Sequence, residues 1–266
     1  MCKLCTEHGD GKIWYKNAKN YASDLISDLR RRQYIRDFLE TTIGEGVASL
    51  GRLETIFRKK KRLPAHLVQG MEGKAREEHF GQIVPIEDIR EIIGKAETVV
   101  RMPCACRWAA ERREKRCCYS VSYSAATWYD GLDMGYFGQP QAAGLERVPG
   151  DEAVNQMEEL GKEGAIHTIW TMITPFIGAI CNCTAQECLG LRTQSMHVET
   201  MARGEYTAVV DPGLCLGCGL CAAACPFAAI SSQTSDGVRL AAVNPSLCQG
   251  CGLCRNHCRA GALSLR

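Results

Sequence analysis

The chain has 266 residues, 45% of them hydrophobic, and a formal net charge of +2. This composition can bury a real core, and the length fits one large domain or a medium domain with a small appendage. The nearly balanced charge gives no reason to expect a nucleic acid or a lipid bilayer as partner. Seventeen cysteines without an apolar N-terminal signal segment argue against a disulfide framework and indicate a reducing compartment, so we expect a cytoplasmic protein.

The N-terminus carries a short thiol motif. Cys2, Cys5 and His8 offer three ligands to a zinc ion, but the local sequence supplies no fourth. N-terminal segments are often poorly ordered. A zinc site is therefore one interpretation of this motif, and a tail without a metal is the other.

Two helices are predicted after this motif. Apolar side chains recur at helical spacing from Tyr21 and indicate an amphipathic helix that ends at Gly44 or Gly46. A second helix is predicted over residues 47–57, and Pro64 breaks the pattern that follows.

The next segment predicts a helix followed by a strand. The helix begins near Pro85, and Ile86, Ile89 and Ile93 lie on one of its faces. Residues 98–102 are apolar and rich in β-branched side chains, which favours a short strand.

The central part of the chain predicts one more helix and a pair of strands. Asp151 is expected to cap the helix, and the strands cover residues 166–173 and 176–180. The most apolar stretch of the chain, residues 165–181, approaches the length of a membrane span, but it contains His167 and several threonines. We therefore predict a buried strand pair and no membrane span.

Seven cysteines in this central region form two groups. They are Cys104, Cys106, Cys117 and Cys118, then Cys181, Cys183 and Cys188. Thiols at neighbouring strand ends can converge although they are distant in sequence, so our preferred hypothesis is an iron-sulfur cluster held by about four of them. A structural zinc site and buried cysteines that act as small apolar side chains are the alternatives. In an extended segment Cys117 and Cys118 point in opposite directions, so we expect only one of them to serve a given site.

From about residue 207 the chain becomes a duplicated unit. The spacing C-x2-C-x2-C-x3-C occurs twice, 33 residues apart, at Cys215, Cys218, Cys221 and Cys225, then at Cys248, Cys251, Cys254 and Cys258. An iron-sulfur cube needs four thiolates, and these short gaps let one tight loop supply three while the fourth cysteine reaches a second cluster. A zinc ribbon also uses paired cysteines, but zinc sites do not normally need two such interlocked groups.

This unit resembles the bacterial-type ferredoxins with two 4Fe-4S clusters. The resemblance covers about residues 207–266 and implies two ligand sets, Cys215, Cys218, Cys221 and Cys258 for one cluster and Cys248, Cys251, Cys254 and Cys225 for the other. Pro226 follows its cysteine as the family pattern asks, but Arg259 stands at the matching position of the second half. A cation there is expected to raise one potential.

Glycines and leucines surround these cysteines. Four glycines can take positive φ and let backbone N–H groups approach the clusters, namely Gly217, Gly219, Gly250 and Gly252. Six apolar residues are expected to form a dry shell, namely Leu214, Leu216, Ile230, Leu247, Leu253 and Leu263. The polar residues 231–237 are predicted to form a surface turn between two short strands.

Other motifs are weak or missing. The basic runs at residues 30–32 and 58–62 fit docking of an acidic redox partner or, more simply, solvated helix faces. The sequence has no Walker loop and no correctly spaced dinucleotide fingerprint. We therefore expect any flavin or nicotinamide cofactor to lie on a partner, such as a flavoprotein or dehydrogenase.

These patterns predict an α+β protein with two domains. Residues 1–206 form a cysteine-rich α/β region with an additional metal site, and residues 207–266 form a small ferredoxin-like two-cluster domain. The preferred function is transfer of single low-potential electrons between redox partner proteins. The layout also resembles the multi-cluster ferredoxin-like proteins of anaerobes, which implies an oxygen-poor cell. The alternative is a reductase whose N-terminal cysteines form the catalytic centre, and a redox sensor ranks below both.

Overall fold

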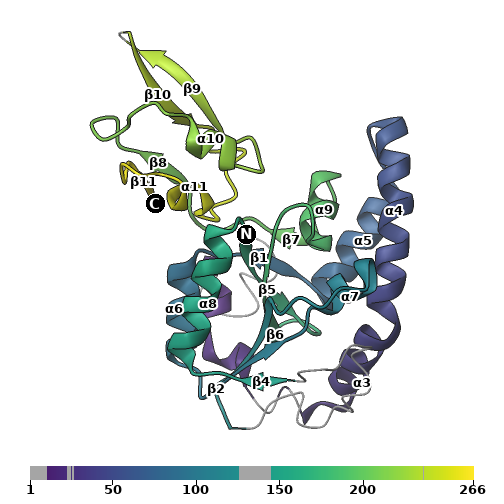
Figure 1. Cartoon of the computed structure of the whole chain (residues 1–266). Coiled ribbons are helices and arrows are strands. Elements are labelled where there is room, and N and C mark those ends of the chain that lie inside the picture. The colour runs from purple at the N-terminus through teal and green to yellow at the C-terminus, as the bar shows by residue number, and fades with distance from the viewer. Residues whose placement is uncertain (1–10, 23–24, 26, 126–144, 236) are drawn as a thin grey trace.

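The larger part of the molecule is built on one sheet. The computed structural model describes residues 11–22, 25, 27–125, 145–235 and 237–266 (Figure 1). Within these ranges the sheet has seven strands in the order β4-β2-β3-β6-β5-β1-β7. The pair β1 and β7 is parallel, and the other pairs are antiparallel. The strands are β1 Gly81–Ile83, β2 Thr98–Met102, β3 Cys118–Ser122, β4 Glu146–Arg147, β5 Ile166–Thr171, β6 Ile177–Cys183 and β7 Met201–Ala202.

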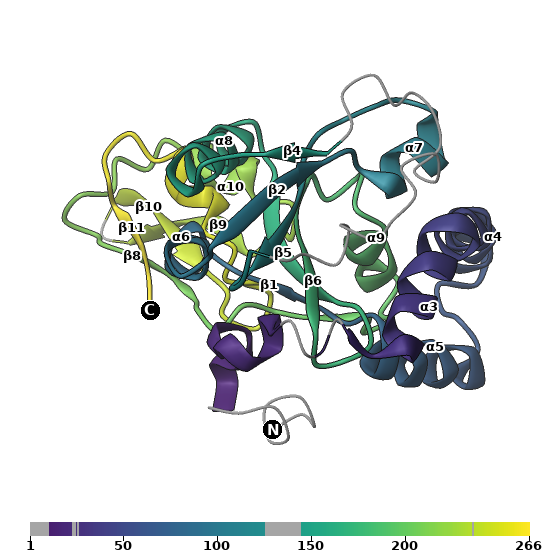
Figure 2. The same ribbon diagram turned by 90° about the horizontal axis from the view of Figure 1, so that it is seen from below.

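Helices lie on both sides of this sheet (Figure 2). Figure 2 shows α6 and α8 on one side, and α3, α4 and α5 in a group at the far side. The helices are η1 Gly11–Lys16, η2 Ala18–Tyr21, α3 Leu29–Asp37, η3 Phe38–Thr42, α4 Ile43–Lys60, α5 Ala65–Glu78, α6 Ile86–Gly94, α7 Ala105–Glu111, α8 Gly150–Lys162 and α9 Leu189–Ser195.

The first face of the sheet packs against α6 and α8. Ile89 and Ile93 of α6 and Met157 of α8 are buried with Val99 and Ile180 from the strands. The isoleucine spacing that predicted this helix therefore marks its core face, and the prediction is confirmed. The helix begins directly after Pro85. Proline suits the start of a helix because it lacks a backbone N–H, and the N–H groups of the first turn have no acceptor within the helix.

The opposite face of the sheet carries the cysteines of the central region. The predicted strand over residues 98–102 is confirmed as β2. The predicted strand pair is confirmed as β5 and β6, which pair antiparallel inside the sheet. None of the helices in the described ranges combines the length and the apolar composition that a membrane span requires.

The long helical segment differs from the prediction. We predicted a helix end at Gly44 or Gly46, but α3 continues through the π-helical turn η3 into α4, which ends at Lys60. Gly44 and Gly46 keep helical backbone within α4, where a Cβ at either position would meet no atom within 4 Å. Glycine costs about 1 kcal/mol in a helix interior, but buried neighbours such as Leu50 offset that cost.

The C-terminal module, residues 207–266, lies beside one end of α8 (Figure 1). Its elements are β8 Ala208–Val210, α10 Leu220–Ala224, β9 Ile230–Ser235, β10 Val238–Val243, α11 Leu253–Asn256 and β11 Leu263–Leu265. β9 pairs with β10, and β8 pairs with β11. The predicted surface turn over residues 231–237 is wrong in part: residues 231–235 belong to β9, and Gly237 lies in the turn before β10. Residues 231–234 are exposed, as predicted.

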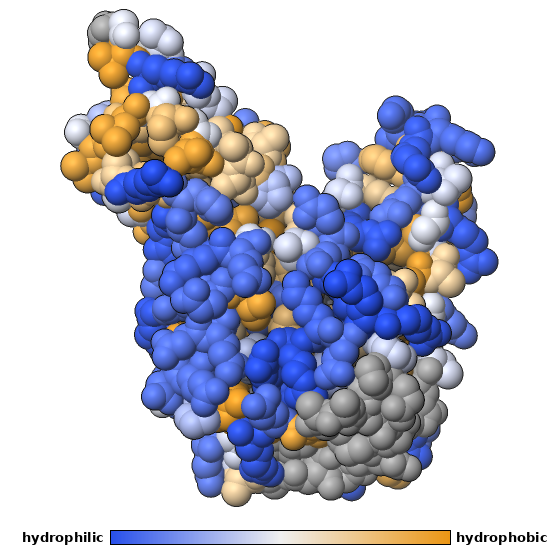
Figure 3. Space-filling model, in the orientation of Figure 1, coloured by the Kyte–Doolittle hydropathy of each residue, from blue (hydrophilic) through white to orange (hydrophobic). Residues whose placement is uncertain are grey.

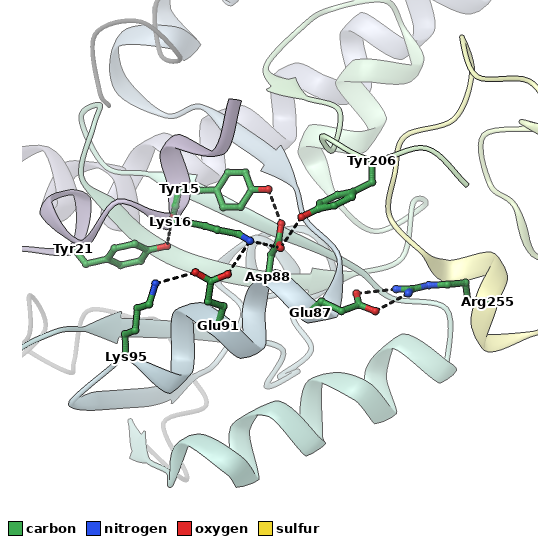
Figure 4. Close-up of polar contacts among 9 residues, drawn as sticks. All are labelled: Tyr15, Lys16, Tyr21, Glu87, Asp88, Glu91, Lys95, Tyr206 and Arg255. Atoms are coloured by element: carbon green, nitrogen blue, oxygen red, sulfur yellow. Dashed lines mark hydrogen bonds and ion pairs between the residues drawn. The ribbon is translucent and has the colours of Figure 1, made fainter. Parts of the chain in front are cut away.

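A charged network joins this module to α6 (Figure 4). Arg255 of α11 donates two hydrogen bonds to Glu87, at 2.5 and 2.8 Å. Beside this pair, Asp88 is only 2% exposed and accepts from Tyr206 at 2.9 Å and from Tyr15 at 2.6 Å. The Arg255 guanidinium lowers the pKa of Glu87, so the pair is charged at neutral pH.

Candidate metal centres

Two glycines let the cysteine loops of the C-terminal module pass close to neighbouring backbone. Gly217 has φ +62°, and a Cβ there would lie 2.1 Å from the Arg239 carbonyl oxygen. Gly250 has φ +69°, and a Cβ there would lie 2.4 Å from the Tyr206 carbonyl oxygen. Only glycine fits these positions, because it has no Cβ that would collide with the neighbouring backbone and it adopts positive φ readily.

The first set of thiols surrounds a small cavity. Cys215, Cys218, Cys221 and Cys258 all line a cavity of about 180 Å³. The backbone N–H of Ala241 donates to Cys215 Sγ at 3.4 Å, and two other N–H groups donate to Cys258 and Cys248 of the same module. Such donors stabilise sulfur that carries negative charge. The structure therefore brings together the four cysteines that the ferredoxin resemblance assigns to one cluster.

The second set crosses between the two halves. Burial raises the pKa of Cys251 to about 11 and that of Cys254 to about 12. Cys225 and Cys248 are neighbours that add to both shifts, so the thiol from the first half lies among those of the second. Neutral thiols of this kind release protons when they bind a metal.

The two sets differ in exposure. Cys218 of the first set is exposed, whereas Cys254 of the second is buried. The predicted dry shell is wrong in part, because Leu216 is 77% exposed and Leu214 is 52% exposed, while Leu253 is buried. Figure 3 shows the apolar atoms that gather on the module. Cys218 therefore opens the first set to solvent, and Cys251 of the second set packs against the core that holds the central thiols.

The central cysteines converge at one end of the sheet. Cys104 and Cys106 lie at the start of α7, Cys117 and Cys118 at the start of β3, Cys181 and Cys183 on β6, and Cys188 just before α9. We predicted thiols at strand ends, and Cys183 is the last residue of β6, whereas Cys181 lies inside that strand. Their alternate positions place both on the face that α7 and α9 cover.

Three of these thiols form the tightest group. The Sγ atoms of Cys104, Cys117 and Cys183 all lie within 4.8 Å of one another, and those of Cys117 and Cys183 are 3.9 Å apart. Beside them, Cys118 Sγ lies 3.7 Å from Cys181 Sγ. A metal ion or cluster needs thiols at this spacing.

Cys117 and Cys118 face the same site, which corrects the prediction that only one of them would. Cys117 precedes β3, so the alternation of the strand does not apply to it. Its carbonyl oxygen accepts from both the backbone N–H and the side-chain amide of Asn182, each at 2.9 Å. These bonds set the direction of its side chain toward Cys183.

The electrostatics favour one thiolate among protonated neighbours. Hydrogen bonds from Cys106, Cys117 and other thiols hold the pKa of Cys104 well below its usual value. The hydrogen bond to Cys104 is the largest cause that raises the pKa of Cys118 and of Cys183. A bound metal would replace these protons, since thiolates are the ligands.

An arginine next to these thiols supports an anionic occupant. The Arg107 backbone N–H donates to Cys104 Sγ at 3.4 Å, and Nη1 pairs with Glu187. Nη2 is buried and has no partner within the described residues. A buried donor without an acceptor is costly, and a metal–thiolate group with net negative charge would supply that acceptor. The donor set fits an iron-sulfur cluster, and it also fits zinc.

Two histidines lie near this site, and sequence reasoning assigned neither of them a role there. His167 Nδ1 donates to Asn182 Oδ1 at 2.6 Å, and Asn182 contacts Cys117, so this histidine is linked to the thiols. His79 lines a cavity that opens beside the thiols. Neither has a local sequence signal. Cys2, Cys5 and His8 lie outside the described residues.

Comparison with known families identifies the C-terminal module. Residues 214–262 match the family model of the 4Fe-4S dicluster domain. A search of curated proteins finds no match to the chain. The matched segment holds both cysteine repeats, so the chain has a ferredoxin-like iron-sulfur module at its C-terminus within an α+β fold.

Proposed function

We propose that this protein conducts single low-potential electrons from a redox partner, through two 4Fe-4S clusters, to a metal site at the central thiols. Each cluster is expected to exchange one electron at a time. The proposed outer ligands are Cys215, Cys218, Cys221 and Cys258. The proposed inner ligands are Cys225, Cys248, Cys251 and Cys254.

One observation carries this proposal: the inner thiol Cys251 packs against the same apolar core that holds the central thiols. Leu253 is buried in the same cluster of side chains as Cys117 and Cys183, and Cys251 packs against it. Packed side chains of this kind favour electron transfer between the module and the central site, and we propose this core as the route.

Two polar side chains, His167 of β5 and Asn256 of α11, border Gly161 of α8. His167 Nε2 and Asn256 Nδ2 lie 3.2 and 3.3 Å from the point where a Cβ on Gly161 would be. A side chain at Gly161 would therefore crowd both His167 and Asn256.

The surface near the outer thiols supports docking of a partner protein. Leu214, Leu216 and Leu220 are exposed around the exposed Cys218. An apolar patch at a redox centre suits a transient protein interface. We propose that the partner is a flavoprotein or a dehydrogenase and that the protein does not bind nucleic acid. We also propose that it acts in the cytoplasm of an oxygen-poor cell.

Metal analysis of anaerobically purified protein tests the proposal. Two clusters correspond to about eight irons per chain, and a third cube raises the count to about twelve. EPR of the dithionite-reduced protein should show interacting cluster signals. Eight irons with one zinc would indicate zinc at the central thiols if that zinc is lost in Cys104→Ala, and colourless protein without iron would refute the electron-transfer function.

The cavity beside the thiols favours a second candidate, a reductase. Cys104 and Cys183 belong to the tight thiol group and also line this cavity. In this proposal the central site delivers electrons to a small molecule instead of a second protein. Reoxidation of the reduced protein by a small-molecule acceptor, without any partner protein, would distinguish the two candidates.

A further inference from the structure

A cavity of about 380 Å³ lies between the central thiols and the helices α4 and α5. This volume falls in the range of pockets that hold small organic ligands. All residues that line it come from the segment between Tyr34 and Thr200. The cavity is therefore separate from the C-terminal module and its cluster ligands.

The cavity has a sulfur end and an apolar end. Six of the seven central thiols, all except Cys117, line the sulfur end. Leu50, Leu53, Met71 and Met172 contribute to the apolar end. A ligand here would lose its water shell along most of its surface, which favours apolar molecules.

An aromatic row forms one wall. The ring of His79 lies 4.3 Å from the ring of Phe38 and 4.8 Å from that of Trp170, centroid to centroid. His79 and Trp170 are nearly parallel, at 19°. All three residues line the cavity. Their flat faces favour a flat ligand, because rings stack at such separations.

His79 offers one hydrogen-bond acceptor. Its Nδ1 donates to the Thr171 carbonyl oxygen at 2.7 Å, so the proton sits on Nδ1 and Nε2 is bare. Within the described ranges, Nε2 has no hydrogen-bond partner. Burial lowers the pKa of His79 to about 4, so the ring stays neutral at physiological pH.

The charges at the cavity are paired. At the sulfur end Arg107 is paired with Glu187, and at the apolar end Lys74 lies 3.8 Å from Glu78. Besides the hydrogen bond to Glu187, the neighbouring Cys183 raises the pKa of the Arg107 guanidinium, so we assign its buried, unpartnered Nη2 to the proposed metal–thiolate group. No charged group is therefore left to neutralise a charged ligand.

The π-helical turn η3 supplies part of the lining. Phe38, Leu39 and Thr42 belong to this turn and all line the cavity. A π-helical turn is rare and occurs mostly at functional sites, since it interrupts the regular hydrogen bonds. Here it turns an aromatic ring toward His79.

We propose that the cavity binds a small, uncharged, flat organic molecule, which stacks on the aromatic row and donates one hydrogen bond to His79 Nε2. This goes beyond electron transfer and places the ligand at the apolar end of the cavity, and it rests on the proposed function in one respect, since Arg107 Nη2 is assigned to the metal–thiolate group. It stands whether the central thiols hold iron or zinc.

Fluorine NMR titrations of the anaerobically purified full chain test the proposal with three probes. 5-Fluoroindole is flat, neutral and carries an N–H donor. Its N-methyl analogue lacks the donor and should bind about fivefold more weakly, in line with the net value of one hydrogen bond. The 2-carboxylate analogue is charged and should not bind at the same concentrations.

Matched variants locate the binding. Gly46 lines the cavity, and a Cβ there meets no atom within 4 Å, so Gly46→Leu can extend into the mouth. Gly51→Leu on the same helix is the control, since Gly51 has equal clearance and does not line the cavity. We expect at least tenfold weaker 5-fluoroindole binding in Gly46→Leu and unchanged binding in Gly51→Leu.

His79→Phe tests the hydrogen bond. This variant keeps a ring in the row and removes the acceptor, so both neutral probes should bind equally well. Three results would overturn the proposal: no binding of 5-fluoroindole to the wild type, equal binding to Gly46→Leu and Gly51→Leu, or tighter binding of the carboxylate. Unchanged visible absorbance of each variant would show that the clusters are retained.

Discussion

At the residue scale, Cys104 occupies a special place among the central thiols. It belongs to the tight group of three, and it receives hydrogen bonds from several neighbouring thiols that favour its thiolate. Its side chain also accepts from the backbone N–H of the first turn of α7. We therefore regard it as the first ligand of any metal at this site.

Removal of Cys104 should empty the central site alone. In Cys104→Ala we expect iron to fall from about twelve to about eight per chain, or one zinc to be lost if zinc is the metal. Metal analysis and EPR measure this result. Cys225→Ala is the reciprocal variant, which should lose the inner cluster of the C-terminal module. If Cys104→Ala keeps its full metal content, this cysteine is not a ligand.

His79 should make stability depend on pH. Its pKa in the folded protein is about 4, below its ordinary value of 6.5, so the unfolded chain binds the extra proton first as pH falls. This contribution is complete above pH 6.5 and is lost between pH 6.5 and 4. From pH 7.5 to 5 it amounts to about 2 kcal/mol of unfolding free energy.

Denaturant titrations of wild type and His79→Phe at both pH values isolate this contribution. The variant should lose about 2 kcal/mol less than the wild type over the same interval, since other groups titrate alike in both proteins. Equal losses would show that His79 is already protonated in the folded state.

At the element scale, glycines play opposite parts in two kinds of segment. In α5, Gly70 has helical backbone, and a Cβ there would meet no atom within 4 Å. In the first cysteine loop, Gly217 has positive φ and lies against the backbone of β10. The helix tolerates its glycine, whereas the loop requires one.

Gly70→Ala should stabilise the helix that covers the cavity. Alanine has the higher helix propensity, so we expect an increase of about 0.5 to 1 kcal/mol in the unfolding free energy. The midpoint of urea unfolding, followed by circular dichroism, measures the change. A decrease would indicate a contact at Gly70 that the glycine preserves.

Gly217→Ala should displace the outer cysteine loop. The added Cβ would collide with the carbonyl of Arg239, so we expect loss of the outer cluster and retention of the inner one. Iron content should drop by about four per chain. Gly237→Ala is the control. Gly237 directly precedes β10, the strand that contains Arg239, and it has φ +77° with no atom within 4 Å of an added Cβ, so alanine there adds backbone strain without a collision.

At the scale of the whole molecule, the charged network on α6 fixes the C-terminal module against the sheet. Glu87 binds Arg255, the residue next to the inner thiol Cys254, and Asp88 binds Tyr206 at the entry to the module. We propose that residues 1–206 and residues 207–266 form two domains, which share a core and unfold together.

Glu87→Gln should loosen this contact. The folded pKa of Glu87 lies below its ordinary value of 4.5, so the charged pair stabilises docking above pH 4.5 and loses this effect below it. At pH 7 we expect faster hydrogen exchange in α11 and slower electron transfer to the central site, with unchanged cluster potentials. Glu91→Gln is the control, because Glu91 lies on the same helix and pairs with Lys16 and Lys95.

The sequence alone determined the C-terminal module, because its ligands follow one another at short, repeated intervals. In C-x2-C-x2-C-x3-C the local backbone positions three thiols, so spacing carries the geometry. The amphipathic helix α6 and the strands β2, β5 and β6 were also predictable, since burial of one face leaves a period in the sequence.

Only the tertiary structure decided the central site and its cavity. Cys104 and Cys188 are far apart in sequence, and they meet because the strand order places β6 beside β3 and next to the start of α7. The aromatic row joins residues from η3, the end of α5 and β5. No local pattern encodes such meetings, because they arise from how the sheet and its covering helices pack.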